Sequence, residues 1–475
     1  MYGDVNVAVE DGNLGRSNKT GGTGTHIKIG ISGVKSSTPI LITGSMNAKK
    51  IKEKLGTSPL ADACIDSVEW GAKSIYCIPV EAGVPGTAGE VKKEAKGTGS
   101  FKVEGNAANT YDIVVVIVDS GDCGEGSYKV SIDGGNTFTD DVTIPLNGTV
   151  ELQDTGLTMK FEDGEGGDAF VEGDSFSFST TAPSMNHTSV INAVESLINN
   201  NLSFEYVHIV GESTKALWAS LATLANDFAI KYKRPLFFIC EARAPKSGET
   251  ADVYAAEMIK ERKGINNYFI QVVCSTSLYT RMDGRTQIIN NAGIVAGLYG
   301  AAKESQSIGE VKTFPISEAK MFKLLPEGIE DHIASLDAAK YLTFRKYVSK
   351  EDYYVTSANM MSPDGSDYKY AEDVRVLNRL MKAVRAQALN ELQSEIDPDN
   401  LEVDVANIEK QLEIPVEEAV RDKVLSSGSV TINTENLNIL ADESLDVRVE
   451  YVPMGHVREM NATFAVNNPY ASSNS

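Results

Sequence analysis

The spacing of apolar residues changes several times along the chain, and each change marks a different kind of predicted element. Short, almost uninterrupted apolar runs alternate with segments in which apolar residues recur every three to four positions, first within residues 26–90 and again after residue 185. Runs of the first kind are typical of buried strands, and segments of the second kind are typical of amphipathic helices. Their alternation predicts a parallel or mixed sheet with helices on both faces.

The predicted elements of this α/β body follow from that alternation. Strands are expected at residues 26–32, 39–44, 73–80, 204–211, 235–242 and 268–275. Helices are expected at residues 47–55, 60–70, 190–200, 249–262 and 287–302, and at a segment capped by Ser213 or Thr214 that runs to about residue 233. A long helix is predicted over residues 371–396, with one apolar face made of Leu377, Leu380, Met381, Val384, Ala388 and Leu392.

The segment 91–184 has a different texture, since its apolar residues alternate with polar ones over short runs. Turns rich in Gly and Asp, such as SGDCGEG and DGGN, separate the runs YDIVVVIV, SYKVSI, FTDDVTIPL, LTMKF and DSFSFST. Closely spaced strands with turns of this composition predict an all-β sandwich or barrel. Because the α/β pattern resumes directly afterwards, this segment is predicted to be a domain inserted into the body.

Both ends of the chain carry further strand-like runs. Residues 4–10, DVNVAVE, alternate apolar and polar side chains, and a polar, glycine-rich linker follows up to residue 25. Towards the other end, Pro415 is expected to begin a helix that Gly428 ends, before strands at residues 429–434, 446–454 and 457–466. The predicted fold is therefore an α/β (α+β) body with flanking terminal β-strand arms and an inserted all-β, sandwich- or barrel-like domain.

These patterns divide the 475 residues into four segments: an N-terminal arm and linker at 1–25, an α/β core at 26–90 plus 185–400, the inserted domain at 91–184, and a C-terminal domain with its strand arm at 401–475. The formal charge of −22 is concentrated in the insert, since residues 97–184 contain 16 acidic residues against Lys102, Lys129 and Lys160. A chain with this balance lacks the basic surface that nucleic acids or anionic membranes require.

No segment carries a recognisable catalytic or cofactor-binding motif. The five cysteines form no CxxC pair and are expected to be reduced core residues, and the five histidines have no metal-ligand neighbour. Residues 30–37, GISGVKSS, lack the spacing of a phosphate-binding loop. The acidic turns 133–141 and 163–168 could hold a weakly bound calcium ion, but hairpin turns explain the same residues. We therefore expect no cofactor and no metal.

One alternative is an enzyme built on the α/β body. Ligands of open α/β sheets bind beyond the carboxyl ends of the strands. The residues expected there are Glu212, Glu241, Arg243, Ser275 and Arg281. No pair among them has a spacing that specifies a reaction, so this alternative, with a site at Glu212, Glu241 and Arg243, rests on fold analogy alone.

The terminal strands favour a different function, which is assembly. They can pair within their own chain, or they can add to the sheet edge of a neighbouring copy through main-chain hydrogen bonds. If the donor and acceptor edges are different surfaces, the contact is heterologous and propagates as a ring or a helix. The pattern alone leaves both possibilities open.

Three segments carry a resemblance to a known family: the opening DVNVAVEDGNLGRSNKTGGTGTHIKIGIS, the block ADACIDSVEWGAKSIYCIPV and the C-terminal LDVRVEYVPMGHVREMNATFAVNNPYA. They resemble the contractile tail sheath proteins of bacteriophages and phage-tail-like particles, which include R-type bacteriocins and contractile injection systems. The inserted stretch, YKVSIDGGNTFTDDVTIPLNG followed by TGLTMKF and GDSFSFSTTAP, resembles the variable β-domain of one branch of that family.

The resemblance implies a structural protein and not an enzyme. Sheath subunits polymerise as stacked, commonly hexameric rings around an inner tail tube, and they contract from a metastable extended state to drive the tube through a target envelope. The implied partners are other copies of the chain, the tube protein, and the baseplate and tail terminator proteins. The work comes from the free-energy difference between two packings, so it requires no active site.

The resemblance also implies roles for particular residues. The N-terminal strand would link subunits through Val5, Val7 and Val9, and the C-terminal strands would do so through Val447, Val449, Tyr451, Met460, Ala462 and Phe464. A helix of the family faces the tube, and the candidate here is 371–396 with its cations Arg375, Arg379, Lys382 and Arg385. The alternative for these cations is a solvated helix face with salt bridges to Glu372 and Asp373. The acidic insert is expected on the outer face of the sheath.

The expected location follows from the same resemblance and from the composition. The sequence shows neither a secretory signal nor the apolar run of ~20 residues that spanning a bilayer requires. We expect assembly in the cytoplasm of a bacterial host, as part of a virion tail or of a released, headless particle, without nucleic acid or membrane insertion. A self-assembling surface protein is a further alternative, against which the missing signal peptide argues.

Overall fold

The computed structural model describes residues 24–166, 168–435 and 437–466, and its largest sheet has six strands in the order β15-β14-β13-β1-β3-β2. These strands are β1 (His26–Ile31), β2 (Ile40–Thr43), β3 (Ser74–Val80), β13 (Tyr206–Glu212), β14 (Phe237–Glu241) and β15 (Ile270–Val273). All neighbouring pairs are parallel except β2 with β3, which is antiparallel. The prediction of a mixed α/β fold is confirmed.

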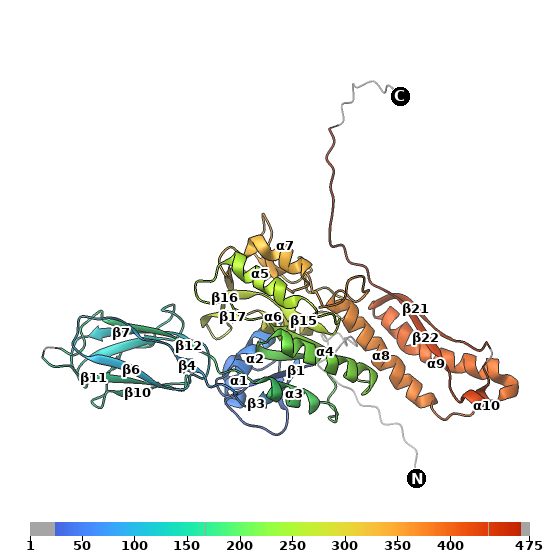
Figure 1. Cartoon of the computed structure of the whole chain (residues 1–475), viewed down its shortest axis with the longest axis horizontal. Coiled ribbons are helices and arrows are strands. Elements are labelled where there is room, and N and C mark those ends of the chain that lie inside the picture. Colours follow the sequence, from blue (N-terminus) through green and yellow to red (C-terminus); the bar gives the residue numbers. More distant parts are fainter. Residues whose placement is uncertain (1–23, 167, 436, 467–475) are drawn as a thin grey trace, which may run out of the picture.

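Helices cover both faces of this sheet (Figure 1). They are α1 (Ala48–Leu55), α2 (Pro59–Glu69), α3 (His187–Glu195), α4 (Lys215–Ile230), α5 (Ala251–Arg262), α6 (Ala292–Ala301) and α7 (Ile333–Ala338). Helices α2 and α6 contact each other on one face, and α3 and α4 contact each other and the sheet on the opposite face, as right-handed crossovers require. The strands between them are buried on both sides, and all six residues of β1 are buried.

One predicted helix was wrong in its first turn. Residues Thr286–Asn290 form strand β17 and not the start of a helix, and α6 begins only at Ala292. Strand β17 pairs with β16 (Thr276–Thr280), which also pairs with β18 (Met321–Leu325). The apolar pair Ile288 and Ile289 fits either period, so the pairing with β16 decides the conformation. A second small sheet contains β19 (Phe344–Lys346) and β20 (Tyr353–Val355), and a 3₁₀ helix η1 (Ile329–His332) precedes α7.

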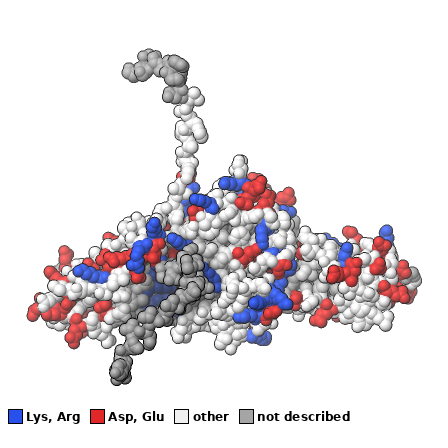
Figure 2. Space-filling model, turned by 180° about the vertical axis from the view of Figure 1, so that it is seen from behind, with Lys and Arg blue, Asp and Glu red and all other residues white. Residues whose placement is uncertain are grey.

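Residues 84–184, called the β-unit below, form two antiparallel sheets around a core of their own. The strands are β4 (Thr87–Ala88), β5 (Lys92–Glu94), β6 (Ser100–Gly105), β7 (Asp112–Asp119), β8 (Ser127–Ser131), β9 (Val142–Thr143), β10 (Thr149–Leu152), β11 (Leu157–Glu162) and β12 (Ser175–Thr181). Phe101, Phe161, Phe170 and Phe176 form an aromatic cluster inside it, with ring centroids 4.7–6.3 Å apart. The β-unit lies at one end of the molecule, and Figure 2 shows acidic side chains along that tapering end.

The C-terminal elements form a separate layer at the opposite end (Figure 1). They are α8 (Ala371–Glu391), η2 (Pro398–Asn400), α9 (Leu401–Arg421), β21 (Leu425–Ile432), α10 (Ile439–Asp442) and β22 (Val447–Pro453). The prediction that Pro415 begins a helix was wrong, because Pro415 lies inside α9, and Gly428 lies inside β21. An interior proline costs about 3 kcal/mol. Burial of one helix face outweighs that cost, through Val405, Ile408, Leu412, Val416 and Ala419.

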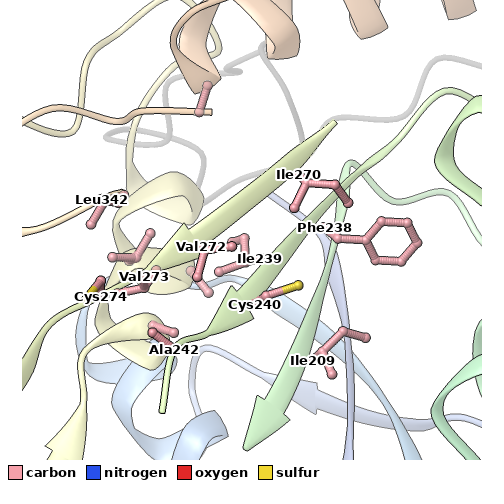
Figure 3. Close-up of a cluster of buried hydrophobic side chains, with 14 of the residues drawn as sticks. Ile209, Phe238, Ile239, Cys240, Ala242, Ile270, Val272, Val273, Cys274 and Leu342 are labelled. Atoms are coloured by element: carbon pink, nitrogen blue, oxygen red, sulfur yellow. The ribbon is translucent and has the colours of Figure 1, made fainter. Parts of the chain in front are cut away.

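The core of the body is largely aliphatic and lies between the large sheet and its helices. Figure 3 shows Ile209, Phe238, Ile239, Cys240 and Val272 on the adjacent strands β13, β14 and β15, and each of these side chains is fully buried. All five cysteines are free and buried, as the sequence predicts. Within the described ranges, no helix combines the length and apolar character needed to cross a bilayer.

Candidate assembly interface

Strands β21 and β22 form a two-stranded antiparallel sheet, and neither outer edge carries another strand among the described residues. The register places three of the residues predicted to link subunits opposite β21: Val447 with Ile432, Val449 with Val430, and Tyr451 with Gly428. In this structure β22 therefore pairs within its own chain. The outer edges still present backbone N–H and C=O groups to which a further strand can bind.

This small sheet is held on the body by α8 and α9. Val430 and Ile432 of β21 are buried in the same apolar cluster as Val376 and Leu380 of α8 and Leu412 of α9. The opposite face of the sheet is open among the described residues: Arg448, Glu450 and Val452 of β22 lie on it and are exposed, Val452 at 53%. One face of the sheet is thus anchored, while its edges and its other face remain free for contacts.

The segment after β22 contains no strand between residues 454 and 466, so the strand predicted at 457–466 is absent from this structure. Figure 1 shows this segment extending away from the body. Met460, Ala462 and Phe464 are all exposed, with Met460 at 84% and Phe464 at 95%. Side chains at alternating positions lie on one side of an extended chain, so these residues form an apolar stripe that no other described residue covers.

The N-terminal residues predicted to link subunits, Val5, Val7 and Val9, lie outside the described residues. The described chain begins at Gly24, whose φ of +57° and close approach to Gly300 exclude a side chain. Thr25 O accepts a hydrogen bond from Glu205 N at 2.9 Å. The chain therefore enters β1 beside the segment that leads into β13.

Three of the four cations predicted to face a tube, Arg375, Arg379 and Lys382, form hydrogen bonds or ion pairs within the chain. Arg375 is fully buried, and its Nη2 donates to Glu205 Oε2 and to Tyr299 O, both at 3.0 Å. Lys382 donates from Nζ to Phe204 O at 2.8 Å, and burial lowers the pKa of Lys382 to about 8. These two side chains join α8 to the body, so they are not available on an outer surface.

The other two cations of α8 differ from each other. Arg379 is 22% exposed and donates from Nη2 to Asp422 Oδ2 at 2.6 Å. Arg385 is exposed and lines an apolar groove between α8, the end of α4 and β22, together with Met381 and Val384. The predicted alternative, salt bridges to Glu372 and Asp373, is not found in the described part of the chain. Arg375 pairs instead with Glu205, and Arg379 pairs with Glu304 and Asp422. A tube contact stays a prediction, for which Arg385 is accessible.

The residues of the enzyme alternative each have a partner within the fold. Glu212 Oε1 accepts from Ala244 N at 2.8 Å, and Arg243 forms ion pairs with Glu249 and Glu257. Ser275 Oγ accepts from Asn291 Nδ2 at 2.9 Å. These contacts order the loops at the carboxyl edge of the sheet, and they do not bring a nucleophile and a base together.

A buried polar chain crosses the centre of the sheet. Lys28 Nζ on β1 lies 2.6 Å from His208 Nδ1 on β13, and His208 Nε2 lies 3.0 Å from Glu241 Oε1 at the end of β14. Burial, and then Lys28, lowers the pKa of His208 well below its usual value. Burial also raises the pKa of Glu241 to about 7. This row of three polar side chains lies inside the sheet, where Lys28 and His208 are fully buried. Its burial indicates a structural role.

A second buried ionic cluster joins the β-unit to the body. Asp62 and Asp66 on α2 bind Arg285 and Arg281 of the β16–β17 hairpin, at 2.7 and 2.8 Å. Asn109 of the β-unit donates to Asp62 Oδ2 at 2.7 Å. Burial would raise the pKa of Asp62, but Arg281 and Arg285 hold it below its usual value. The sequence pattern placed Arg281 in a ligand crevice and did not predict this cluster. The signal for the cluster was the matching i,i+4 spacing of Asp62 and Asp66 on α2 and of Arg281 and Arg285 in the hairpin.

The acidic turns and the glycine-rich loop are explained by local hydrogen bonds. Asp133 accepts from Thr137 N at 2.9 Å and from Ser131 Oγ at 2.7 Å, and Asp163 accepts from Cys123 N at 2.8 Å. Ser32 Oγ in the loop after β1 donates to Leu55 O at 2.6 Å, beside a cavity of about 700 Å³ between the body and the β-unit. No group of three His, Cys, Asp or Glu side chains within the described part of the chain is arranged to hold a metal ion.

The sequence matches one protein family over nearly its whole length. The DUF2586 N-terminal domain matches residues 2–359, and the DUF2586 C-terminal domain matches residues 367–471. The chain belongs to the DUF2586 family. A search of curated proteins finds no match. The two matched domains of this DUF2586 protein meet just before α8, whereas the sequence pattern placed the start of the C-terminal domain at residue 401.

Two solved structures share the fold of this DUF2586 protein. A sheath tail protein from Desulfitobacterium hafniense is 12% identical with a TM-score of 0.50, and the match covers 95% of this chain and 100% of that one. The contracted helical sheath of the anti-feeding prophage is 8% identical with a TM-score of 0.51, covering 98% of this chain and 100% of that one. The chain therefore has the fold of contractile tail sheath proteins, which confirms the resemblance seen in the sequence.

Proposed function

We propose that this DUF2586 protein is the sheath subunit of a contractile tail. The observation that carries the proposal is the match of fold over 98% of this chain and 100% of a helical sheath subunit, which leaves no domain of either chain unaccounted for. In this function the subunits form stacked rings around an inner tube, and they contract from a metastable extended state without catalysis. The tube, baseplate and terminator proteins are the proposed partners.

The open edges of β21 and β22 support a mode of assembly by strand exchange. An N-terminal strand with Val5, Val7 and Val9 would add to one edge of another copy, and the C-terminal segment with Met460, Ala462 and Phe464 would supply a further strand. Because donor and acceptor are different surfaces, the contact is heterologous and propagates. Each strand added would cover backbone groups that are otherwise open at an edge.

The position of the β-unit supports an outer location for it. It lies at the end of the molecule opposite α8 and α9 (Figure 1), so a tube contact by Arg385 on α8 would direct it outward. Residues 97–184 carry a net charge of −13. Like-charge repulsion between neighbouring units would then oppose lateral clumping of assembled sheaths.

Negative-stain microscopy of the purified protein, alone and co-expressed with its tube, tests the proposal. We expect hollow tubes or stacked rings. Deletion of residues 1–12 is expected to abolish polymerisation without unfolding the body, because the described residues from 24 onward form the buried clusters of the body among themselves. A protein that stays monomeric in the presence of its tube would contradict the sheath function. Normal sheath tubes formed by the deleted protein would contradict the strand exchange.

A further inference from the structure

The segment that follows β22 is held at the start of α8 by a single arginine. Arg458 forms an ion pair from Nη2 to Glu372 Oε1, and its guanidinium lies 3.6 Å from the centroid of the Tyr370 ring. We call Tyr370, Glu372 and Asp373 the arginine niche. Arg458 makes the only ion pair of residues 454–466 among the described residues.

The arginine niche contains a buried carboxylate that requires a cation beside it. Glu372 is 2% exposed, and its Oε2 has no hydrogen-bond partner in the described part of the chain. The pKa of Asp373 is raised to about 6, because burial and the neighbouring Glu372 raise it by more than Arg458 lowers it. A buried carboxylate that loses its cation is strongly unfavourable. The niche therefore retains Arg458 even though most of the segment makes no such contact.

The residues on either side of Arg458 behave differently from it. Val457 is 75% exposed, Met460 is 84% exposed and Phe464 is 95% exposed, whereas the Arg458 side chain is 28% exposed. The backbone of this segment forms no strand. The contact thus fixes one point of an otherwise open segment, five residues beyond the end of β22 at Pro453.

We propose that Arg458 is a positioning residue that anchors the C-terminal segment on α8, so that residues 459–466 leave the body from a fixed point towards a second copy of this chain. The second copy as partner rests on the proposed sheath function, whereas the anchor itself does not. Fixing the start of a binding segment reduces the conformational entropy lost when it binds. The apolar stripe of Met460, Ala462 and Phe464 thereby starts two residues beyond a fixed point on the body.

Substitution of Arg458 by methionine tests the anchor, because it keeps a long apolar stem and removes the charge. Spin labels at N461C on the segment and N390C on α8 report the distance between them, since the five native cysteines are buried. We expect a narrow distance distribution in the parent protein and one at least twofold broader in R458M. The matched control is R421M, because Arg421 at the end of α9 pairs with Glu418 on an exposed surface away from the β21–β22 sheet. It should leave the distribution unchanged, and E372Q should broaden it.

Self-assembly followed by light scattering tests the positioning role separately. We expect R458M to elongate about tenfold more slowly than R421M. A broadened distribution with normal elongation would overturn the positioning role, and an unchanged distribution would overturn the anchor. If the parent shows a narrow distribution but never assembles, alone or with its tube, the anchor holds and the sheath function fails.

Discussion

Removal of the β-unit is expected to leave the α/β body folded. The β-unit has its own apolar core, and its two ends meet where Val84 N donates to Ser184 O and Ser184 N donates to Val84 O. Joining Val84 to Ser184 through two glycines keeps this antiparallel pair and removes residues 85–183. A deletion of residues 97–184, the segment in which the negative charge is concentrated, would instead leave β4 and β5 in the chain while removing β12, the strand with which both of them pair.

The cost of this deletion follows from the contacts that it removes. Asn109 no longer donates to Asp62, and Gln287 no longer donates to Thr110 O at 3.3 Å. A hydrogen bond to a charged group contributes about 1.5–3 kcal/mol and a neutral one about 0.5–1.5 kcal/mol. The body should therefore lose about 2–4.5 kcal/mol. With an unfolding entropy of about 2.1 cal/mol/K per residue over roughly 380 residues, this loss corresponds to a fall in Tm of about 3–6 °C. Water that reaches Asp62 reduces this loss.

Scanning calorimetry and near-UV circular dichroism of the deleted protein measure the outcome. We expect one cooperative transition and native-like aromatic signals from the body. Asn109→Ala in the full chain is the matched control, since it removes the hydrogen bond to Asp62 alone and should cost about 1.5–3 kcal/mol. A deleted protein without a cooperative transition, alongside a mildly destabilised control, would refute the independence of the two cores.

Two further predictions concern the buried charges. Asp62→Ala leaves Arg285 and Arg281 without one of their two buried carboxylates, so urea unfolding should show a loss of about 3–5 kcal/mol; a loss below 1 kcal/mol would refute a tightly coupled cluster. Glu241 has a folded pKa of about 7, above its unfolded value of 4.5, so the folded state binds this proton more tightly and stability falls as the pH rises between those values. Glu241→Gln should remove up to about 3 kcal/mol of that fall relative to the parent, as measured by urea unfolding across this pH range; equal pH profiles of the two proteins would contradict the raised pKa.

Apolar periodicity determined most of the order of elements in this protein. The strands of the large sheet and the helix at α8 follow from side-chain spacing, because burial of a strand or of one helix face is a local property of the sequence. Where two local rules competed, the fold decided between them. Pro415 is a favourable first residue of a helix, yet α9 begins at Leu401, because its apolar face packs against α8 and β21.

Only the tertiary structure decided which charged side chains are available on the surface. Spacing alone presents Arg375, Arg379 and Lys382 as one basic stripe. In the fold, Glu205 engages Arg375 from 170 residues away, and Phe204 engages Lys382 from 178 residues away. The arginine niche likewise joins Arg458 to a residue 86 positions earlier. Contacts between distant segments depend on how helices and strands pack, and no local pattern of hydrophobic and polar residues contains that information.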